Sequence, residues 1–304
     1  MTQPPPLFDR ALHRVRLDRA AGRFAGADFL KRRAAEDLAQ RLAAINRRFE
    51  VAIELGARTG LFAGVLAGSE AAGKIDRLVQ ADLSAAMLGR GRGLRVAADE
   101  ARLPFAAASA DLILSSLALH WVDDLVGALI QIRRVLKPDG LFLGAVLGGA
   151  TLTELRAALM EAELELTGGA GPRVSPFLDP YDGGSLMQRA GFALPVVDVD
   201  TVRARYDHPL KLIADLRAMG ETSVLAQRPR APLGRPVLAR ASELYMQRFG
   251  EADGRVTATF EIITLTGWAP HPDQQRPAAR GSARMRLADA LGTRERPAGE
   301  KAGR

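Results

Sequence analysis

The sequence contains no cysteine, and this absence removes several kinds of chemistry. Without a thiol the chain forms no disulfide, has no cysteine nucleophile and binds no metal through thiolates. It also has no run of eighteen apolar residues, so we expect no stable insertion into a membrane. The first residues are rich in proline and lack the apolar segment of a secretory signal. These absences are typical of a cytoplasmic protein, which is the location that we predict.

Charge is unevenly distributed along this chain, whose formal net charge is +7. The first fifty residues hold eleven Lys and Arg against six Asp and Glu, and residues 271–304 hold eight against four. The segment between them is therefore close to neutral. Basic ends can contact an anionic partner, but the sequence has no nucleic-acid reading motif and no basic platform with interleaved aromatic residues. We expect no nucleic-acid partner and, since His and Asp do not cluster at ligand spacing, no metal site.

The stretch 51–60 has the pattern of a buried strand, a turn and the start of a helix. The strand ends beside Glu54, and the turn contains Gly56 and Gly60, with Arg58 at the middle position of a Gly-x-Gly-x-Gly loop. Glycine lets a backbone approach a ligand, and the N-terminus of the following helix faces the same place. Short glycine turns after strands are common, so this loop either binds a ligand or simply connects two elements.

Strands and helices alternate after this loop. Further strands are expected at 77–81, 94–98, 110–116 and 141–147. The helices expected between them are 59–67, 84–90 and 125–136, the last stopped by Lys137–Gly140. The apolar segment 110–116 is typical of a parallel strand covered on both faces. The alternation predicts an α/β fold with a doubly wound parallel sheet.

Mostly helical segments flank this region. Before it, helices are expected at 8–23 and 28–48, with Asp28 as the cap of the second. After it, we expect helices at 153–166 and 184–190 and a mostly helical segment over 209–250 that is interrupted at 227–236. Alternating apolar residues predict two late strands, 193–206 and 256–265.

Acidic residues follow the ends of three predicted strands. In an open α/β sheet, ligands bind at the edge where the parallel strands end. Asp82 stands where a carboxylate can accept hydrogen bonds from a pair of ribose hydroxyls. Asp99 stands where a carboxylate can accept a hydrogen bond from the exocyclic amine of an adenine. Glu54 can meet an ammonium group. The alternative for Asp82 is that it only caps the helix that follows it.

Several motifs together resemble the class I S-adenosylmethionine-dependent methyltransferases. They are Ile53–Gly60, Asp82, Ala98–Glu100 with Leu103–Phe105, and Arg134–Gly140. The stretches Ser115–Asp124 and Leu147–Arg156 resemble the branch that holds the biotin-pathway malonyl-carrier-protein methyltransferase and mitochondrial complex I assembly factor 5. Three further motifs are closer to bacterial relatives of the assembly factor, namely Phe8–Arg10, Gly267–His271 and Gly281–Ala283.

The resemblance implies a Rossmann-like sheet of seven strands whose last strand is antiparallel. It implies three parts of the chain: an N-terminal helical cover (1–48), a methyltransferase domain (49–292) with a helical lid insertion at about 203–250, and a disordered basic tail (293–304). The cofactor that it implies is S-adenosylmethionine. The residues expected to bind this cofactor are Glu54, Gly56, Arg58, Gly60, Asp82, Leu83, Asp99, Glu100 and Ser115.

Individual roles follow from the same resemblance. Glu54, Gly56 and Gly60 would line the methionine part of the cofactor, Asp82 would hold the ribose, and Asp99 the adenine, with Leu83 packed on its ring. Arg58 stands where the family usually has glycine. Its side chain would therefore either crowd the cofactor or reach the cofactor's carboxylate.

Methyl transfer needs positioning and exclusion of water more than it needs a metal or a covalent nucleophile. His120 follows the fourth strand and is the candidate catalytic residue, as a general base or as a group that orients a carboxylate. The alternative is that His120 only packs beside Trp121. The predicted function is methyl transfer to a small or acyl-carrier-linked carboxylate. Two alternatives are a maturation enzyme for a complex I subunit, similar to an arginine hydroxylase, and a protein that binds the cofactor without catalysis.

Overall fold

The computed structural model describes residues 5–274, 282 and 285–294. The chain divides into two compact units, residues 1–270 and residues 271–304. In the second unit, the described residues include one short helix, α10 (Leu287–Ala290). Most of the tail predicted to be disordered lies outside the described residues, as does the Gly281–Ala283 motif apart from Ser282.

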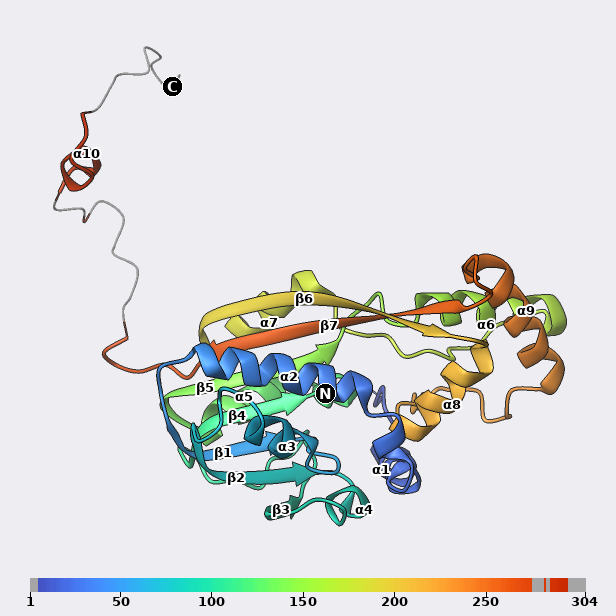
Figure 1. The fold of residues 1–304 in the computed structure, drawn as a ribbon, viewed down its shortest axis with the longest axis horizontal. Helices are drawn as coiled ribbons and strands as arrows, with labels where there is room; N and C mark the ends of the chain where they lie inside the picture. The colour runs from blue at the N-terminus through green and yellow to red at the C-terminus, as the bar shows by residue number, and fades with distance from the viewer. Residues whose placement is uncertain (1–4, 275–281, 283–284, 295–304) are drawn as a thin grey trace. The chain divides into compact units, whose positions relative to one another are not determined.

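Within the described residues, a seven-stranded sheet forms the centre of the first unit (Figure 1). The strands are β1 (Phe49–Leu55), β2 (Ile75–Asp82), β3 (Leu94–Ala97), β4 (Ala110–Ser116), β5 (Leu136–Leu147), β6 (Ala193–Tyr206) and β7 (Val256–Trp268). Their order in the sheet is β3-β2-β1-β4-β5-β7-β6. Strands β1 to β5 pair in parallel, whereas β7 is antiparallel to both of its neighbours. The predicted Rossmann-like sheet with an antiparallel last strand is confirmed.

Helices cover both faces of the sheet and extend beyond one end of it (Figure 1). They are α1 (Arg10–Ala20), α2 (Phe29–Ala44), α3 (Leu61–Ala67), α4 (Ala85–Leu88), α5 (Leu125–Val135), α6 (Thr153–Thr167), α7 (Pro180–Arg189), α8 (Pro209–Met219) and α9 (Arg235–Phe249), with the short 3-10 turns η1 (Phe24–Gly26) and η2 (Leu119–Trp121). Figure 1 shows α6 and α9 beside the far ends of β6 and β7. These helices share a core with the two strands, to which Phe260 and Tyr245 contribute.

The central strand β4 explains why the sheet needs cover on both sides. Every residue of β4 is buried. Because side chains alternate across a strand, Leu112 and Leu114 pack into the core under α2 and α3, whereas Ile113 packs into the core under α5 and α7. An apolar strand of this kind is stable only between two helical layers.

Some element boundaries differ from those expected. The helix expected from Gly184 begins at Pro180, because Asp179 caps it by accepting a hydrogen bond from the Tyr181 amide. Helix α5 ends at Val135, but the segment 137–140 forms an irregular first part of β5, with Asp139 in the left-handed region, instead of a separate stop. Asp28 does not cap α2 through its side chain and pairs with Arg32.

The order of the strands reverses between β1 and β4. These two strands are parallel neighbours, with Leu55 opposite Ser115 at their carboxyl ends. The chain leaves β1 toward one side of the sheet and leaves β4 toward the other, and such a reversal is where open α/β sheets bind ligands. The loops that carry Glu54, Asp82, Asp99 and His120, each at or after the carboxyl end of one of the parallel strands β1 to β4, therefore lie along one edge of the sheet.

Candidate functional site

In the loop after β1, the three residues at the glycine positions of the Gly-x-Gly-x-Gly pattern have a left-handed backbone conformation. The φ angles are +67° at Gly56, +53° at Arg58 and +75° at Gly60. A Cβ atom at Gly56 would lie 2.2 Å from the Cβ of Ala118, and one at Gly60 would lie 2.4 Å from Oε1 of Gln80. The contact with Ala118 requires glycine at position 56, whereas glycine at position 60 is favoured mainly by its positive φ, because the end of the Gln80 side chain can move. Arg58 keeps the backbone angle of a glycine at a cost of roughly 1–2 kcal/mol.

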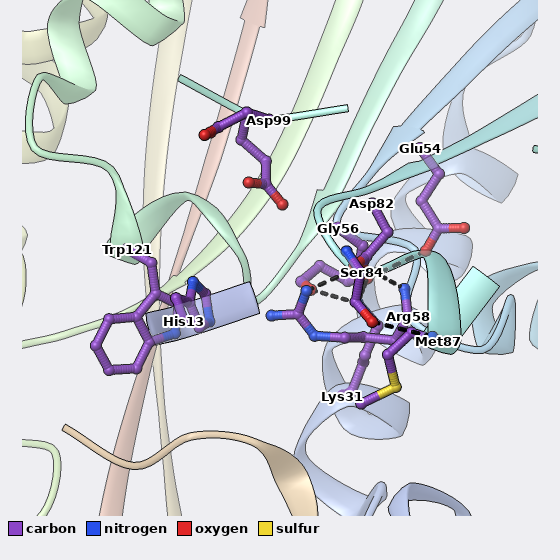
Figure 2. A network of polar contacts seen from close by, with 12 residues as sticks. His13, Lys31, Glu54, Gly56, Arg58, Asp82, Ser84, Met87, Asp99 and Trp121 are labelled. Carbon is purple, nitrogen blue, oxygen red and sulfur yellow. Dashed lines mark hydrogen bonds and ion pairs between the residues drawn. The ribbon is translucent and has the colours of Figure 1, made fainter. Parts of the chain in front are cut away.

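The side chain of Arg58 is buried and turns toward Asp82 at the end of β2 (Figure 2). The Arg58 amide and its Nη1 both donate to Asp82 Oδ2, at 2.8 and 3.0 Å, and the Ser84 amide donates to Oδ1 at 2.8 Å. Burial alone lowers the pKa of Arg58, but the charges of Asp82 and Glu221 outweigh burial and raise that pKa above its ordinary value. The carboxylate expected to hold a ribose therefore already holds a guanidinium.

A second cation reaches the loop after β3. Arg10 of α1 lies 2.6 Å from Asp99 Oδ1 through its Nη2 and pairs with Glu100 through the same nitrogen. Burial raises the pKa of Glu100, and the charge of Arg10 opposes this shift. Leu83 packs in a cluster that includes Leu17 of α1. The residues expected around an adenine are thus covered by the N-terminal helix.

A third cation lies at the junction of β1 and β4. Lys31 of α2 donates from Nζ to the carbonyl oxygens of Gly56 and Ser116, both at 2.6 Å, and to Ser116 Oγ at 2.8 Å. Ser116 Oγ in turn lies 3.4 Å from Oε1 of Glu54. Burial raises the pKa of Glu54 to about 7 and lowers that of Lys31 to about 8, although the opposite charges of the two groups limit both shifts.

Sequence reasoning missed Glu221, which follows the left-handed Gly220 at the end of α8. Its Oε2 accepts a hydrogen bond from Trp121 Nε1 at 2.7 Å and lies 3.2 Å from His120 Nε2, and its Oε1 lies 3.5 Å from Arg58 Nη2. Burial alone would raise the pKa of Glu221, but the contact with His120 and the charge of Arg58 lower it to about 2. The segment expected to form a lid thus contributes a carboxylate to the sheet edge.

Sequence reasoning also missed His13, a buried residue of α1. Its ring centre lies 5.0 Å from that of Trp121, and Nδ1 lies 3.3 Å from Arg10 Nη1. Burial, reinforced by the charge of Arg58, lowers the pKa of His13 to about 2. The His13 ring thus packs against Trp121 at this edge of the sheet.

This edge has unused capacity for a polar, positively charged ligand. Among the described residues, buried polar atoms without a hydrogen-bond partner include His13 Nε2, Glu54 Oε2, Ser115 Oγ and His120 Nδ1. Five carboxylates gather here against three cations, the carboxylates being those of Glu54, Asp82, Asp99, Glu100 and Glu221. Such unsatisfied groups are costly unless a ligand or water completes them. The donors and the excess negative charge fit the hydroxyls, ammonium and sulfonium of S-adenosylmethionine.

Comparison with known proteins identifies the family. A family model described as a methyltransferase domain matches residues 53–144. The mitochondrial arginine-hydroxylase NDUFAF5 of Danio rerio is 39% identical over 291 residues, which cover 93% of this chain and 89% of that protein. The malonyl-[acyl-carrier protein] O-methyltransferase of Methylovorus sp. is 34% identical over 306 residues, which cover 93% of this chain and 100% of that protein. The chain belongs to the class I S-adenosylmethionine-dependent methyltransferases.

Membership of the class I methyltransferases makes S-adenosylmethionine the cofactor of this chain. A solved structure of phosphoethanolamine N-methyltransferase 2 from Haemonchus contortus shares the fold, with a TM-score of 0.52, 15% sequence identity, and coverage of 85% of this chain and 60% of that one. Among the described residues, no helix is both long and apolar enough to cross a membrane. In that same part of the chain, no group of three or more His, Asp or Glu side chains is arranged to hold a metal ion.

Proposed function

We propose that this methyltransferase moves a methyl group onto a carboxylate oxygen of a small molecule or of an acyl chain held on a carrier protein. One juxtaposition carries the proposal. The edge of the sheet has an excess of buried carboxylates, which suits a cationic cofactor, and His120 lies at the same edge with an unpartnered Nδ1. The relative from Methylovorus, which is named for this reaction, matches nearly the whole chain.

Methyl transfer to a carboxylate requires mainly that the protein position the two reactants. When bound, S-adenosylmethionine supplies a methyl group on a positively charged sulfur, from which an acceptor oxygen can displace it in line. A carboxylate acceptor already carries the attacking electron pair, so the new C–O bond forms as the C–S bond breaks and no proton is removed. In our proposal Asp82 holds the ribose, Glu54 faces the ammonium, and His120 Nδ1 orients the acceptor carboxylate. The cover of α1 and η1 excludes water.

The surface of α1 supports an acyl-carrier-linked substrate. Arg14, Arg19 and Arg23 are exposed on or just after this helix, which lies over the site through Arg10 and His13. A basic surface on the helix that contacts the site would steer an acidic carrier protein toward it. The chain would then recognise the carrier through α1 and the acyl group through the sheet edge.

The test is a transfer assay with the full chain. The protein is incubated with methyl-labelled S-adenosylmethionine and a malonyl thioester on an acyl-carrier protein, with free malonate in a parallel sample. We expect a labelled methyl ester on the carrier-linked substrate, and less or none on free malonate. If neither sample gains label while the protein binds the cofactor, the proposed acceptor class is wrong.

A second candidate function is hydroxylation of an arginine on a subunit of respiratory complex I. The observation that favours it is the 39% identity to an arginine-hydroxylase over 93% of this chain. This reaction would need an external oxidant such as dioxygen, together with a reductant. Mass spectrometry of the subunit after incubation separates the two candidates, because hydroxylation adds one oxygen atom to an arginine, whereas methyl transfer to a small or carrier-linked carboxylate leaves the mass of the subunit unchanged.

A further inference from the structure

Lys31 is an unusual residue to find on the buried face of α2. Its neighbours on that face are apolar, including Leu30, Ala34 and Leu38, and Lys31 itself is only 5% exposed. Burying an ammonium group is costly unless hydrogen bonds and opposite charge compensate it. The position of Lys31 therefore depends on the acceptors that surround its Nζ.

Those acceptors form a complete cradle for one ammonium group. A lysine ammonium has three N–H donors, and Lys31 directs them at two carbonyl oxygens and one hydroxyl, at 2.6, 2.6 and 2.8 Å. The carbonyls belong to Gly56 and Ser116, at the carboxyl ends of β1 and β4. The carboxylate of Glu54 lies beside the hydroxyl and keeps one oxygen without a partner.

S-adenosylmethionine carries one primary ammonium, on its methionine part. Two of the residues assigned to that part lie at this cradle: Gly56 accepts from Lys31 Nζ through its carbonyl oxygen, and Glu54 lies next to the Ser116 hydroxyl that also accepts from Nζ. The ammonium of Lys31 and the ammonium of the cofactor thus require the same oxygens, and these oxygens can surround only one ammonium group at a time. We propose that Lys31 competes with the ammonium of the cofactor for this cradle, so that it sets the strength with which the protein holds the amino-acid end of its cofactor.

The structure offers Lys31 a place to withdraw to. A small cavity of about 20 Å³, room for about one group the size of a water molecule or an ammonium, adjoins the side chain, with apolar walls that include Phe24, Leu117 and Met219. Asp28 and Glu221 also line this cavity. A lysine that swings into the cavity can keep its stem against apolar atoms while its ammonium approaches a carboxylate. When Lys31 leaves the cradle, its ammonium can therefore still lie near a carboxylate.

The inference rests on the proposed cofactor contacts of Glu54 and Gly56, and it is tested without a methyl acceptor. Two probes are compared by calorimetry: S-adenosylhomocysteine and 5′-methylthioadenosine, which is the same adenosine thioether without the amino-acid end. In the native protein the ammonium of S-adenosylhomocysteine should add little to the binding affinity, because it must displace Lys31. In Lys31→Met the cradle is open, so the preference for S-adenosylhomocysteine should rise roughly tenfold or more, about the value of one charge-assisted hydrogen bond.

Lys74→Met is the matched control. Lys74 also donates to backbone carbonyls, those of Leu42, Ala43 and Ile45 at the end of α2, but it lies outside the site. The Lys74→Met substitution should lower the free energy of unfolding without changing the preference for S-adenosylhomocysteine over 5′-methylthioadenosine. Lys31→Ala guards against a methionine that fills the cradle. The proposal is overturned if both Lys31 variants, folded by circular dichroism, keep or reduce the native preference. An inactive native protein that still binds the probes would count against the proposed acceptor and not against Lys31.

Discussion

Two regions of the molecule hold ion pairs of similar length but of very different character. At the sheet edge, Arg58 and Asp82 are 3.0 Å apart, with side chains 1% and 0% exposed. At the end of β6, Arg205 lies 2.6 Å from both Glu251 and Asp253, with each side chain about two fifths exposed or more. Water and salt compete for the second set and not for the first. Burial, and not distance, decides which charges organise this protein.

The largest effect should come from Asp82→Ala. The substitution removes the acceptor proposed for the ribose and leaves Arg58 buried without its main partner. Breaking a buried pair from one side costs about 3–5 kcal/mol of unfolding free energy. We also expect cofactor affinity to fall at least ~100-fold, the value of two charge-assisted hydrogen bonds. Urea unfolding and calorimetry measure the two effects.

Asp76→Ala on the same strand is the control. Asp76 pairs with Arg48 in an exposed position, so neither stability nor affinity should change measurably. If Asp82→Ala binds S-adenosylmethionine as tightly as the native protein does, Asp82 is not part of the cofactor site.

The double variant Asp82→Ala, Arg58→Met sharpens the comparison. If the cost of the single change comes from a stranded guanidinium, removing that guanidinium should restore about 1–3 kcal/mol of stability. Removing an exposed partner would give no such recovery. Cofactor affinity should stay low, because the carboxylate is still absent. A double variant that is less stable than Asp82→Ala would show that Arg58 stabilises the loop mainly through other contacts, such as the one with Glu221.

The fold was predictable from sequence because its signals are local. The apolar run 110–116 and the alternating valines of 193–206 gave their strands with the observed bounds. Asp82 and Glu54 could be selected as site residues because parallel strands end at a common edge. Which roles they have toward the cofactor stays a prediction.

The partners of these acids were not predictable in the same way. Glu221 lies more than 160 residues from Arg58 along the chain, and no periodic pattern reports such a distance. Lys31 left a weak signal, since it falls on the Leu30, Ala34 and Leu38 face of α2. Because the first fifty residues contain eleven basic residues, Lys31 could not be distinguished by sequence from a solvent-exposed lysine. Lys31 and Arg10 could not be distinguished from the many other basic residues of the first fifty, whereas Arg58 was recognised because it stands in the glycine loop.

Glu221→Gln tests the pH dependence of the buried network, with a smaller expected effect. The pKa of Glu221 is lowered from 4.5 to about 2 in the folded protein. A lowered carboxyl pKa gives stability that is present above the unfolded value and is lost as pH falls from about 4.5 toward 2. The native protein should exceed the variant by at most about 3 kcal/mol at pH 7, and this difference should shrink by pH 3.

Measuring both proteins by urea unfolding at each pH cancels the contributions of titrating groups that do not interact with Glu221. The glutamine keeps the shape and a hydrogen-bonding group near Trp121 and Arg58, so the variant should fold. A difference that is constant from pH 7 to pH 3 would mean that the charge of Glu221 does not stabilise the fold.

The smallest effect is expected at the other side of the comparison, from Arg205→Ala. Arg205 lies on β6, at the edge of the sheet, and its two carboxylate partners remain hydrated when it is removed. Because no charge is stranded in the interior, the thermal midpoint should stay within the error of the measurement at both low and high salt. The same salt series should leave the cost of Asp82→Ala nearly unchanged, since buried charges are poorly screened. A loss at Arg205 that approached the loss at Asp82 would remove burial as the explanation for the difference between the two regions.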